Sequence, residues 1–130
     1  MKKRELRKTR RFKVENSFPL KVCIPQSNAR AYSLRTLSEG GFGCLIPFRD
    51  AGIVQHPEID IRFTFGDRTL SFKGTVQYCT FLPKQGSSYL GVKFAEIDPR
   101  QELVLKTIIQ AALKKGHLTN EAIPAEAEAS

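Results

Sequence analysis

The chain has 130 residues, of which 41% are hydrophobic, and its formal net charge is +8. This size and apolar content fit one domain with a single core. No apolar run approaches the length of a membrane span, and no hydrophobic stretch follows the N-terminal charges as it would in a secretory signal. We therefore expect a cytoplasmic protein without a membrane span.

Nearly all of the surplus charge lies in residues 1–13. This segment holds eight of the 21 Lys and Arg and one acid, Glu5, whereas residues 14–130 hold 13 bases and 12 acids. Because the segment lacks apolar periodicity, we expect a flexible basic arm in front of a near-neutral body. This distribution favours a specific anionic partner, and a solubilising or loosely anion-seeking tail is the simpler alternative.

Six segments between residues 18 and 94 have the alternation and the turn signals of β-strands. In the second segment the alternation of Tyr32 and Leu34 extends to Thr36. In the fifth, Tyr78 falls on the face of Leu70 and its apolar neighbours. The expected strands are 18–24, 31–37, 42–46, 59–65, 70–78 and 89–94. Their short, regular spacing favours a closed barrel over an open sheet.

The period becomes helical after the last of these strands. Asp98 can cap a helix, Pro99 suits its first position, and Gly116 is a stop signal after an apolar stripe. We expect residues 14–116 to form the barrel and this helix, and residues 117–130 to form a disordered acidic tail. The stripe would cap one end of the barrel or pair with a second copy, so the oligomeric state stays open.

The residues that most often carry metal or redox chemistry are scattered. Cys23, Cys44 and Cys79 have unrelated spacings, which favours buried reduced thiols, and His56 and His117 are isolated. No metal cluster, no carboxylate pair and no nucleophile with a base beside it can be recognised in the sequence. We therefore expect neither an enzyme nor a metal site.

Three motifs occur in a definite order along the chain. They are Arg7-x-x-x-Arg11, Thr36-x-Ser38-x-x-Gly41 and, in the last strand, Tyr89-Leu90-Gly91-Val92-Lys93-Phe94. With these three motifs in this order, the chain resembles the PilZ domain family over about residues 4–114. The resemblance implies a mainly β fold, a six-stranded antiparallel barrel with a C-terminal α-helix. It also implies a bacterial receptor for the second messenger cyclic di-GMP, with no other cofactor.

The resemblance also implies the residues of the ligand site. They are Arg7, Arg10, Arg11, Thr36, Ser38 and Gly41. An Arg guanidinium can grip a phosphate, hydrogen-bond a guanine edge or stack on a purine, so the arm would close over the ligand. Ser38 would offer a hydroxyl, and Gly41 would permit a close backbone approach or a positive φ. The simpler interpretation of this segment is a plain hairpin turn.

The chain departs from the family pattern at two places. Position 36 is Thr where the family has Asp or Asn, and one hydroxyl offers less to a guanine edge than a carboxylate or an amide. A lost charge-assisted contact costs about 1.5–3 kcal/mol. In the arm, Lys13 lies next to the apolar Val14 and competes with Arg11 for the second motif position. In that register the first position would be Thr9.

Four functions can be ordered from these observations. The first is a cyclic di-GMP receptor whose arm and surface change on binding and so regulate an unidentified partner protein. The second is a degenerate PilZ-like module that binds only proteins. Nucleic-acid binding is third, because the barrel segment is almost neutral and its aromatic residues mostly alternate toward a core. An enzyme comes last.

Overall fold

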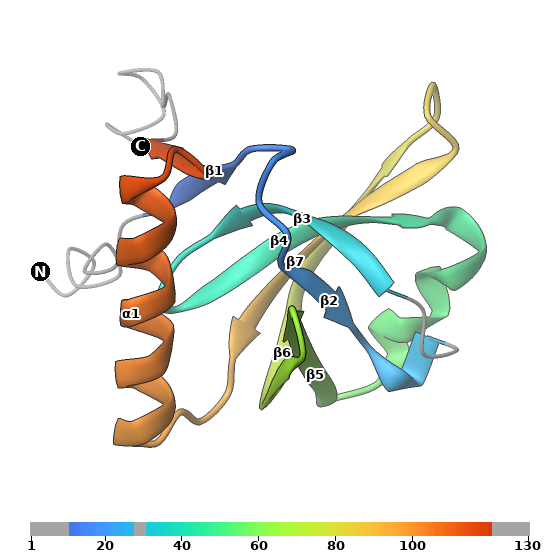
Figure 1. Ribbon diagram of the computed structural model, residues 1–130. Coiled ribbons are helices and arrows are strands. Elements are labelled where there is room, and N and C mark those ends of the chain that lie inside the picture. Colours follow the sequence, from blue (N-terminus) through green and yellow to red (C-terminus); the bar gives the residue numbers. More distant parts are fainter. Residues whose placement is uncertain (1–10, 28–30, 121–130) are drawn as a thin grey trace, which may run out of the picture.

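The computed structural model describes residues 11–27 and 31–120, and strands are its predominant secondary structure (Figure 1). The strands are β1 (Phe12–Val14), β2 (Lys21–Cys23), β3 (Ala31–Leu37), β4 (Gly41–Pro47), β5 (Ile59–Phe65), β6 (Arg68–Leu82), β7 (Ser87–Phe94) and β8 (Leu118–Asn120). The helices are α1 (Pro99–Lys114) and the 3-10 helices η2 (Pro25–Ser27) and η3 (Phe48–Gln55).

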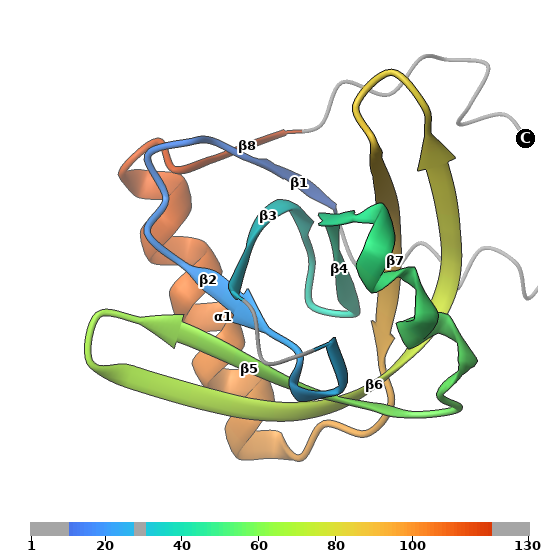
Figure 2. The same ribbon diagram turned by 90° about the vertical axis from the view of Figure 1, so that its right-hand side faces the viewer.

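Six of the strands form a closed antiparallel ring in the order β2-β5-β6-β7-β4-β3, because β3 also pairs with β2 (Figure 2). The predicted six-stranded antiparallel barrel with a C-terminal helix is therefore confirmed. The ring closes at Val22, which lies opposite Tyr32 on one side and Phe63 on the other. The first predicted strand, 18–24, is shorter than expected, since Pro19 has no N–H for the ladder.

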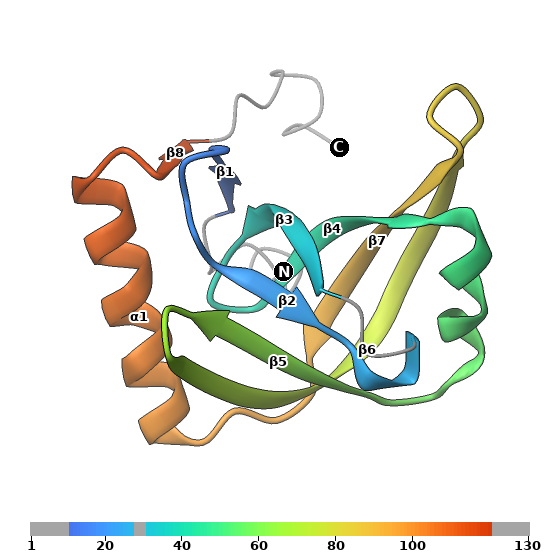
Figure 3. The same cartoon turned by 45° about the vertical axis from the view of Figure 1, so that its right-hand side comes forward.

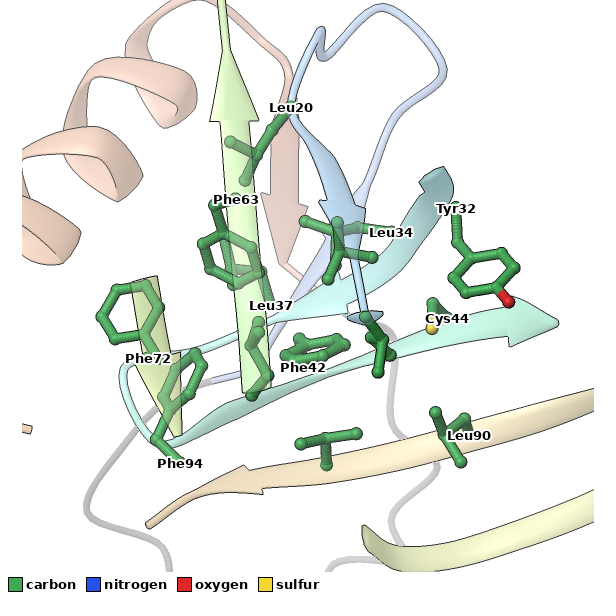
Figure 4. Close-up of a cluster of buried hydrophobic side chains, with 14 of the residues drawn as sticks. Leu20, Tyr32, Leu34, Leu37, Phe42, Cys44, Phe63, Phe72, Leu90 and Phe94 are labelled. Carbon is green, nitrogen blue, oxygen red and sulfur yellow. The ribbon is translucent and has the colours of Figure 1, made fainter. Parts of the chain in front are cut away.

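The core fills the barrel with the inward side chains of these strands. Phe63 is 1% exposed, and its ring meets those of Phe42 and Phe72 edge-on at centroid distances of 5.5 and 5.3 Å (Figure 4). Such edge-to-face pairs add to the free energy of burying the rings. The inside of the barrel is thus packed with side chains, and the outer face has the space for a ligand.

Helix α1 covers one end of the barrel, and η3 with the β6–β7 hairpin lies at the other (Figure 3). The N-terminus of α1 has the predicted cap. The Gln101 N–H donates to Asp98 Oδ1 at 2.8 Å, and the Asp98 N–H donates to Gln101 Oε1 at 3.0 Å. Leu105 and Ile109 are buried against the core. This part of the helix stripe therefore caps the barrel, whereas Leu103 of the same stripe is exposed.

Two short strands change the predicted boundaries of the arm and the tail. Lys13 pairs with Thr119, and Leu118, which was assigned to a disordered tail, is 2% exposed in β8. The half-buried Phe12 packs against the core, so β1 begins inside the expected arm. Three-residue strands leave too little alternation to recognise in a sequence. The remaining parts of the arm (1–10) and tail (121–130) lie outside the described residues.

Candidate functional site

A β-bulge in β3 turns Thr36 to the outside of the barrel. Leu34 pairs with Cys44 and Thr36 with Gly43, so Arg35 is an extra residue without an opposite partner in β4. An extra residue reverses the alternation of the residues that follow. Thr36 therefore lies half-exposed on the outer face, and the prediction that it continues the core face of Tyr32 was wrong.

A second bulge, in β6, does the same for Tyr78. Val76 pairs with Val92 and Tyr78 with Gly91, which leaves Gln77 as the extra residue. Tyr78 is consequently 45% exposed, and the prediction that it shares the inward face of Leu70 was wrong. The two bulges bring a hydroxyl and an aromatic ring to the same outer face of the barrel.

Two paired glycines form the floor under the aromatic rings. A Cβ atom on Gly91 would lie 2.3 Å from the Tyr78 ring, and one on Gly43 would lie 2.1 Å from the Tyr89 hydroxyl. The two rings stack with centroids 6.1 Å apart and planes 16° apart. The glycines thus let flat aromatic side chains lie directly on the backbone, which produces a platform on the barrel wall.

The platform borders a groove of about 480 Å³ on the outer face. Arg11, Thr36, Ser38, Gly41, Tyr78 and Lys93 are among its lining residues. The structure therefore brings four of the predicted site residues together, whereas Arg7 and Arg10 lie outside the described residues. Two cations and no carboxylate line the groove within the described part of the chain, so its electrostatic character favours an anion.

The Ser38 hydroxyl is fully engaged in the turn between β3 and β4. It accepts from the Gly40 and Gly41 N–H groups at 3.1 and 3.2 Å, and it donates to the Gly41 carbonyl oxygen at 3.3 Å. A hydroxyl has one proton and two lone pairs, so these contacts use its capacity. Ser38 shapes the edge of the groove, and a ligand contact would require it to exchange a partner.

Gly41 is needed for close packing between strands. A Cβ atom there would lie 2.1 Å from the Val92 carbonyl oxygen, and Gly41 is not among the glycines with positive φ. Of the two expected reasons for this glycine, close backbone approach therefore applies, and the approach is to β7. The neighbouring Gly40 carbonyl accepts from the Phe94 N–H at 3.0 Å, which ties the same turn to that strand.

The Thr36 hydroxyl shares a 3.1 Å hydrogen bond with the Tyr89 hydroxyl. One of its few hydrogen-bonding positions is thus already used, and the groove has no carboxylate or amide at position 36 to read a base edge. Position 36 therefore has less hydrogen-bonding capacity to offer a ligand than an acid or an amide would have.

Arg11 is the residue of the arm that the structure places at the groove. In β1, Phe12 lies opposite the buried Leu37, and Lys13 lies opposite Thr36. The first apolar residue of the barrel is therefore Phe12, which follows Arg11 directly and removes the reason for preferring Lys13 in the motif. Arg11 lines the groove, and Lys13 is exposed outside it.

Gln77, Tyr78 and Lys93 are among the groove residues that sequence reasoning missed. No signal in the alternation revealed the bulge at Gln77, so Tyr78 was assigned to the core. Lys93 was recognisable, because it lies between the apolar Val92 and Phe94 in a strand and must point outward.

The cysteines and histidines lie away from this groove. Cys44 is buried, which raises the pKa of its thiol to about 12, and Cys23 and Cys79 are half-buried and free. His117 stacks on Phe18 and shares a 2.8 Å hydrogen bond with the Ser17 hydroxyl. No group of His, Cys, Asp or Glu that could hold a metal ion occurs in residues 11–27 and 31–120.

Comparisons with known proteins identify a family. The model of the PilZ domain family matches residues 5–111. The PilZ domain of Escherichia coli YcgR, solved with c-di-GMP, is 18% identical, with a TM-score of 0.60 over 85% of this chain and 93% of that one. A search of curated proteins found no match.

Two longer proteins share the fold at similarly low identity. The K. pneumonia MrkH–c-di-GMP complex is 11% identical, with a TM-score of 0.71 over 85% of this chain and 53% of that one. Bacillus subtilis MotI/DgrA, an inhibitor of motility, is 16% identical, with a TM-score of 0.63 over 84% of this chain and 52% of that one. This chain thus spans about half the length of each. None of the described helices is both long and apolar enough to cross a bilayer.

Proposed function

Since the chain belongs to the PilZ domain family, we propose that it is a receptor for cyclic di-GMP, which binds in the groove beside Arg11. The observation that carries the proposal is the convergence of Arg11, Thr36 and the Ser38–Gly41 turn around one groove with a tyrosine platform. These parts come from separate segments of the chain, and the fold brings them together on one wall.

The proposed roles follow from the chemistry of each side chain. Arg7, Arg10 and Arg11 grip the phosphates and guanines of the ligand, because a planar guanidinium can pair with both. The exposed Tyr78 ring offers its face to a base, a contact of about 1–3 kcal/mol. Thr36 lines the groove, and its hydroxyl, already bonded to Tyr89, offers the ligand little. Ser38 and Gly41 hold the turn that shapes the edge of the groove.

Binding would act on the surface of the protein without catalysis. Arg11 directly precedes β1, and β1 pairs with β8, which follows α1. A ligand held by Arg11 would therefore lie next to this pair of terminal strands. We propose that a partner protein in the cytoplasm reads this altered surface, and that nucleic acid is not the partner.

Isothermal titration of the full chain with cyclic di-GMP tests the receptor function. We expect saturable heat and a strong loss of affinity in Arg11→Ala, since a charge-assisted contact contributes about 1.5–3 kcal/mol. Arg49→Ala is a matched control, because Arg49 is exposed and does not line the groove. No heat at high protein concentration would exclude the receptor function.

The degenerate, protein-binding module remains the second candidate on a specific observation. Both hydroxyls expected at the site are engaged within the protein, Thr36 with Tyr89 and Ser38 within its turn. This candidate predicts a folded protein that gives no heat with the dinucleotide. It also predicts a partner, recovered by pull-down, whose binding survives deletion of residues 1–10.

A further inference from the structure

Lys93 holds a fixed position on the barrel wall of the groove. It lies near the C-terminal end of β7, opposite Gly41 on β4 and Thr75 on β6, so paired strands flank it on both sides. Its neighbours Val92 and Phe94 are buried, and its own side chain is therefore directed outward, where it lines the groove. Lys93 therefore has its backbone in place before any ligand arrives.

The ammonium group of Lys93 has no partner among the residues that the structure describes. Within residues 11–27 and 31–120 it forms neither an ion pair nor a side-chain hydrogen bond. Other exposed lysines do have partners: Lys73 pairs with Asp60, and Lys106 pairs with Glu102. Lys93 thus lines the same groove as a second cation, Arg11, and no carboxylate of the described chain lies between them. Two like charges around one groove are stabilised when an anion binds between them.

We propose that Lys93 binds a phosphate group of the ligand from the barrel wall of the groove that Arg11 also lines. This inference rests on the proposed function and adds to it a residue outside the two motifs that suggested the site. Lysine suits the task because its compact charge needs no particular orientation of the phosphate. The Tyr78 ring at the same groove would meet the adjacent base.

The fixed backbone of Lys93 gives its charge an energetic advantage. Ordering the backbone of a residue on binding costs about 1–2 kcal/mol and reduces the net contribution of the contact that it makes. Lys93 has only side-chain freedom to lose. It therefore adds affinity for a phosphate in a groove where Thr36 offers a base only one hydroxyl, which is already bonded to Tyr89.

The test compares Lys93→Gln, Lys93→Arg and the wild type by titration with cyclic di-GMP at low and high salt. We expect Lys93→Gln to lower the affinity roughly tenfold at low salt, with a smaller loss at high salt, because one charge-assisted contact disappears. Lys93→Arg should retain most of the affinity. Lys84→Gln removes the same charge from the exposed β6–β7 loop and should have little effect.

A second measurement does not depend on the variants. Acetylation of exposed lysines, followed by mass spectrometry, should show that cyclic di-GMP protects Lys93 and leaves Lys84 reactive. Equal affinity of Lys93→Gln and the wild type, with no protection of Lys93, would overturn the inference and leave the receptor function intact. Absence of any binding by the wild type would instead overturn the receptor function, and the role of Lys93 with it.

Discussion

Gly91 and Gly43 lie opposite each other on neighbouring strands, and each leaves room for a tyrosine ring. Both are backbone positions within a hydrogen-bonded ladder, so the strand has little freedom to move away from a larger side chain. The position of the Tyr78 ring at the groove therefore depends directly on the missing Cβ atom of Gly91.

We expect Gly91→Ala to displace the Tyr78 ring, because the new methyl group would lie 2.3 Å from it. The overpacking should cost about 1–3 kcal/mol of the free energy of unfolding, and the displaced ring should weaken binding of cyclic di-GMP. Urea unfolding and calorimetric titration measure the two effects. Gly52→Ala is the matched control, since nothing lies within 4 Å of the added atom. Unchanged binding in Gly91→Ala would show that the ring is not part of the site.

Thr36→Asp tests the residue that departs from the family pattern. A carboxylate accepts hydrogen bonds from guanine N–H groups and can still accept one from the Tyr89 hydroxyl, so we expect affinity for cyclic di-GMP to be equal or tighter. Thr36→Val, which removes only the hydroxyl, should change the affinity little because that hydroxyl is already paired. A tenfold lower affinity of Thr36→Asp for cyclic di-GMP would mean that position 36 does not face a base.

At the level of elements, periodicity predicted the strands and missed their bulges. The core positions, such as Ile61 and Phe63, follow from alternation because one face of each strand must be buried. A bulge depends on contacts with the neighbouring strand, so neither Arg35 nor Gln77 could be recognised as an extra residue. The Thr36-x-Ser38-x-x-Gly41 motif predicted the β3–β4 side of the groove. The β6 side could be recognised only from the pairing of β6 with β7 in the structure.

The pairing of β1 with β8 gives a prediction about stability. Leu118 is 2% exposed, and Leu118→Ala should lower the free energy of unfolding by about 2–5 kcal/mol, since it leaves a cavity in the core. Thr119→Ala in the same strand is the control, because Thr119 is exposed. Urea denaturation distinguishes the two variants. Equal urea midpoints of Leu118→Ala and Thr119→Ala would indicate that the burial of Leu118 in β8 contributes little to the stability of the fold.

A buried polar network joins η2, β3 and η3. The Tyr32 hydroxyl is 2.6 Å from Asp50 Oδ2, to which it donates, and 2.8 Å from the Ser27 hydroxyl oxygen. Burial and the Asp50 carboxylate raise the pKa of Tyr32 to about 12 from its ordinary value of 10.0. Between pH 10 and about pH 12, Tyr32 thus keeps its proton in the folded protein and has lost it in the unfolded chain. The stabilisation by this group is complete below pH 10 and should disappear as the pH rises to about 12.

Tyr32→Phe should remove this alkaline dependence and cost about 1–3 kcal/mol at neutral pH, because the buried Asp50 carboxylate loses a donor. Urea unfolding at a series of pH values measures both effects. Tyr78→Phe serves for comparison, since Tyr78 is exposed. A wild-type stability that stays constant between pH 10 and 12 would contradict the assignment.

In the molecule as a whole, the core and the proposed site use opposite faces of the same strands. Val92 and Phe94 pack inward from β7, and Lys93 between them lines the groove. The barrel can therefore be stable whether or not a ligand is bound. The arm joins the barrel at Arg11, directly before the paired strand β1.

This separation predicts that deletion of residues 1–10 will leave the fold intact and weaken the binding of cyclic di-GMP. The truncated chain keeps Phe12 in β1, and its unfolding midpoint in urea should match that of the full chain. Its affinity in calorimetric titration should fall, because Arg7 and Arg10 are removed while Arg11 and Lys93 remain. A deletion that extends through Val14 should also lower stability, since it removes the partner of β8. If the shorter deletion binds the ligand as tightly as the full chain, Arg7 and Arg10 are not part of the site, and recognition lies in Arg11 and the barrel wall.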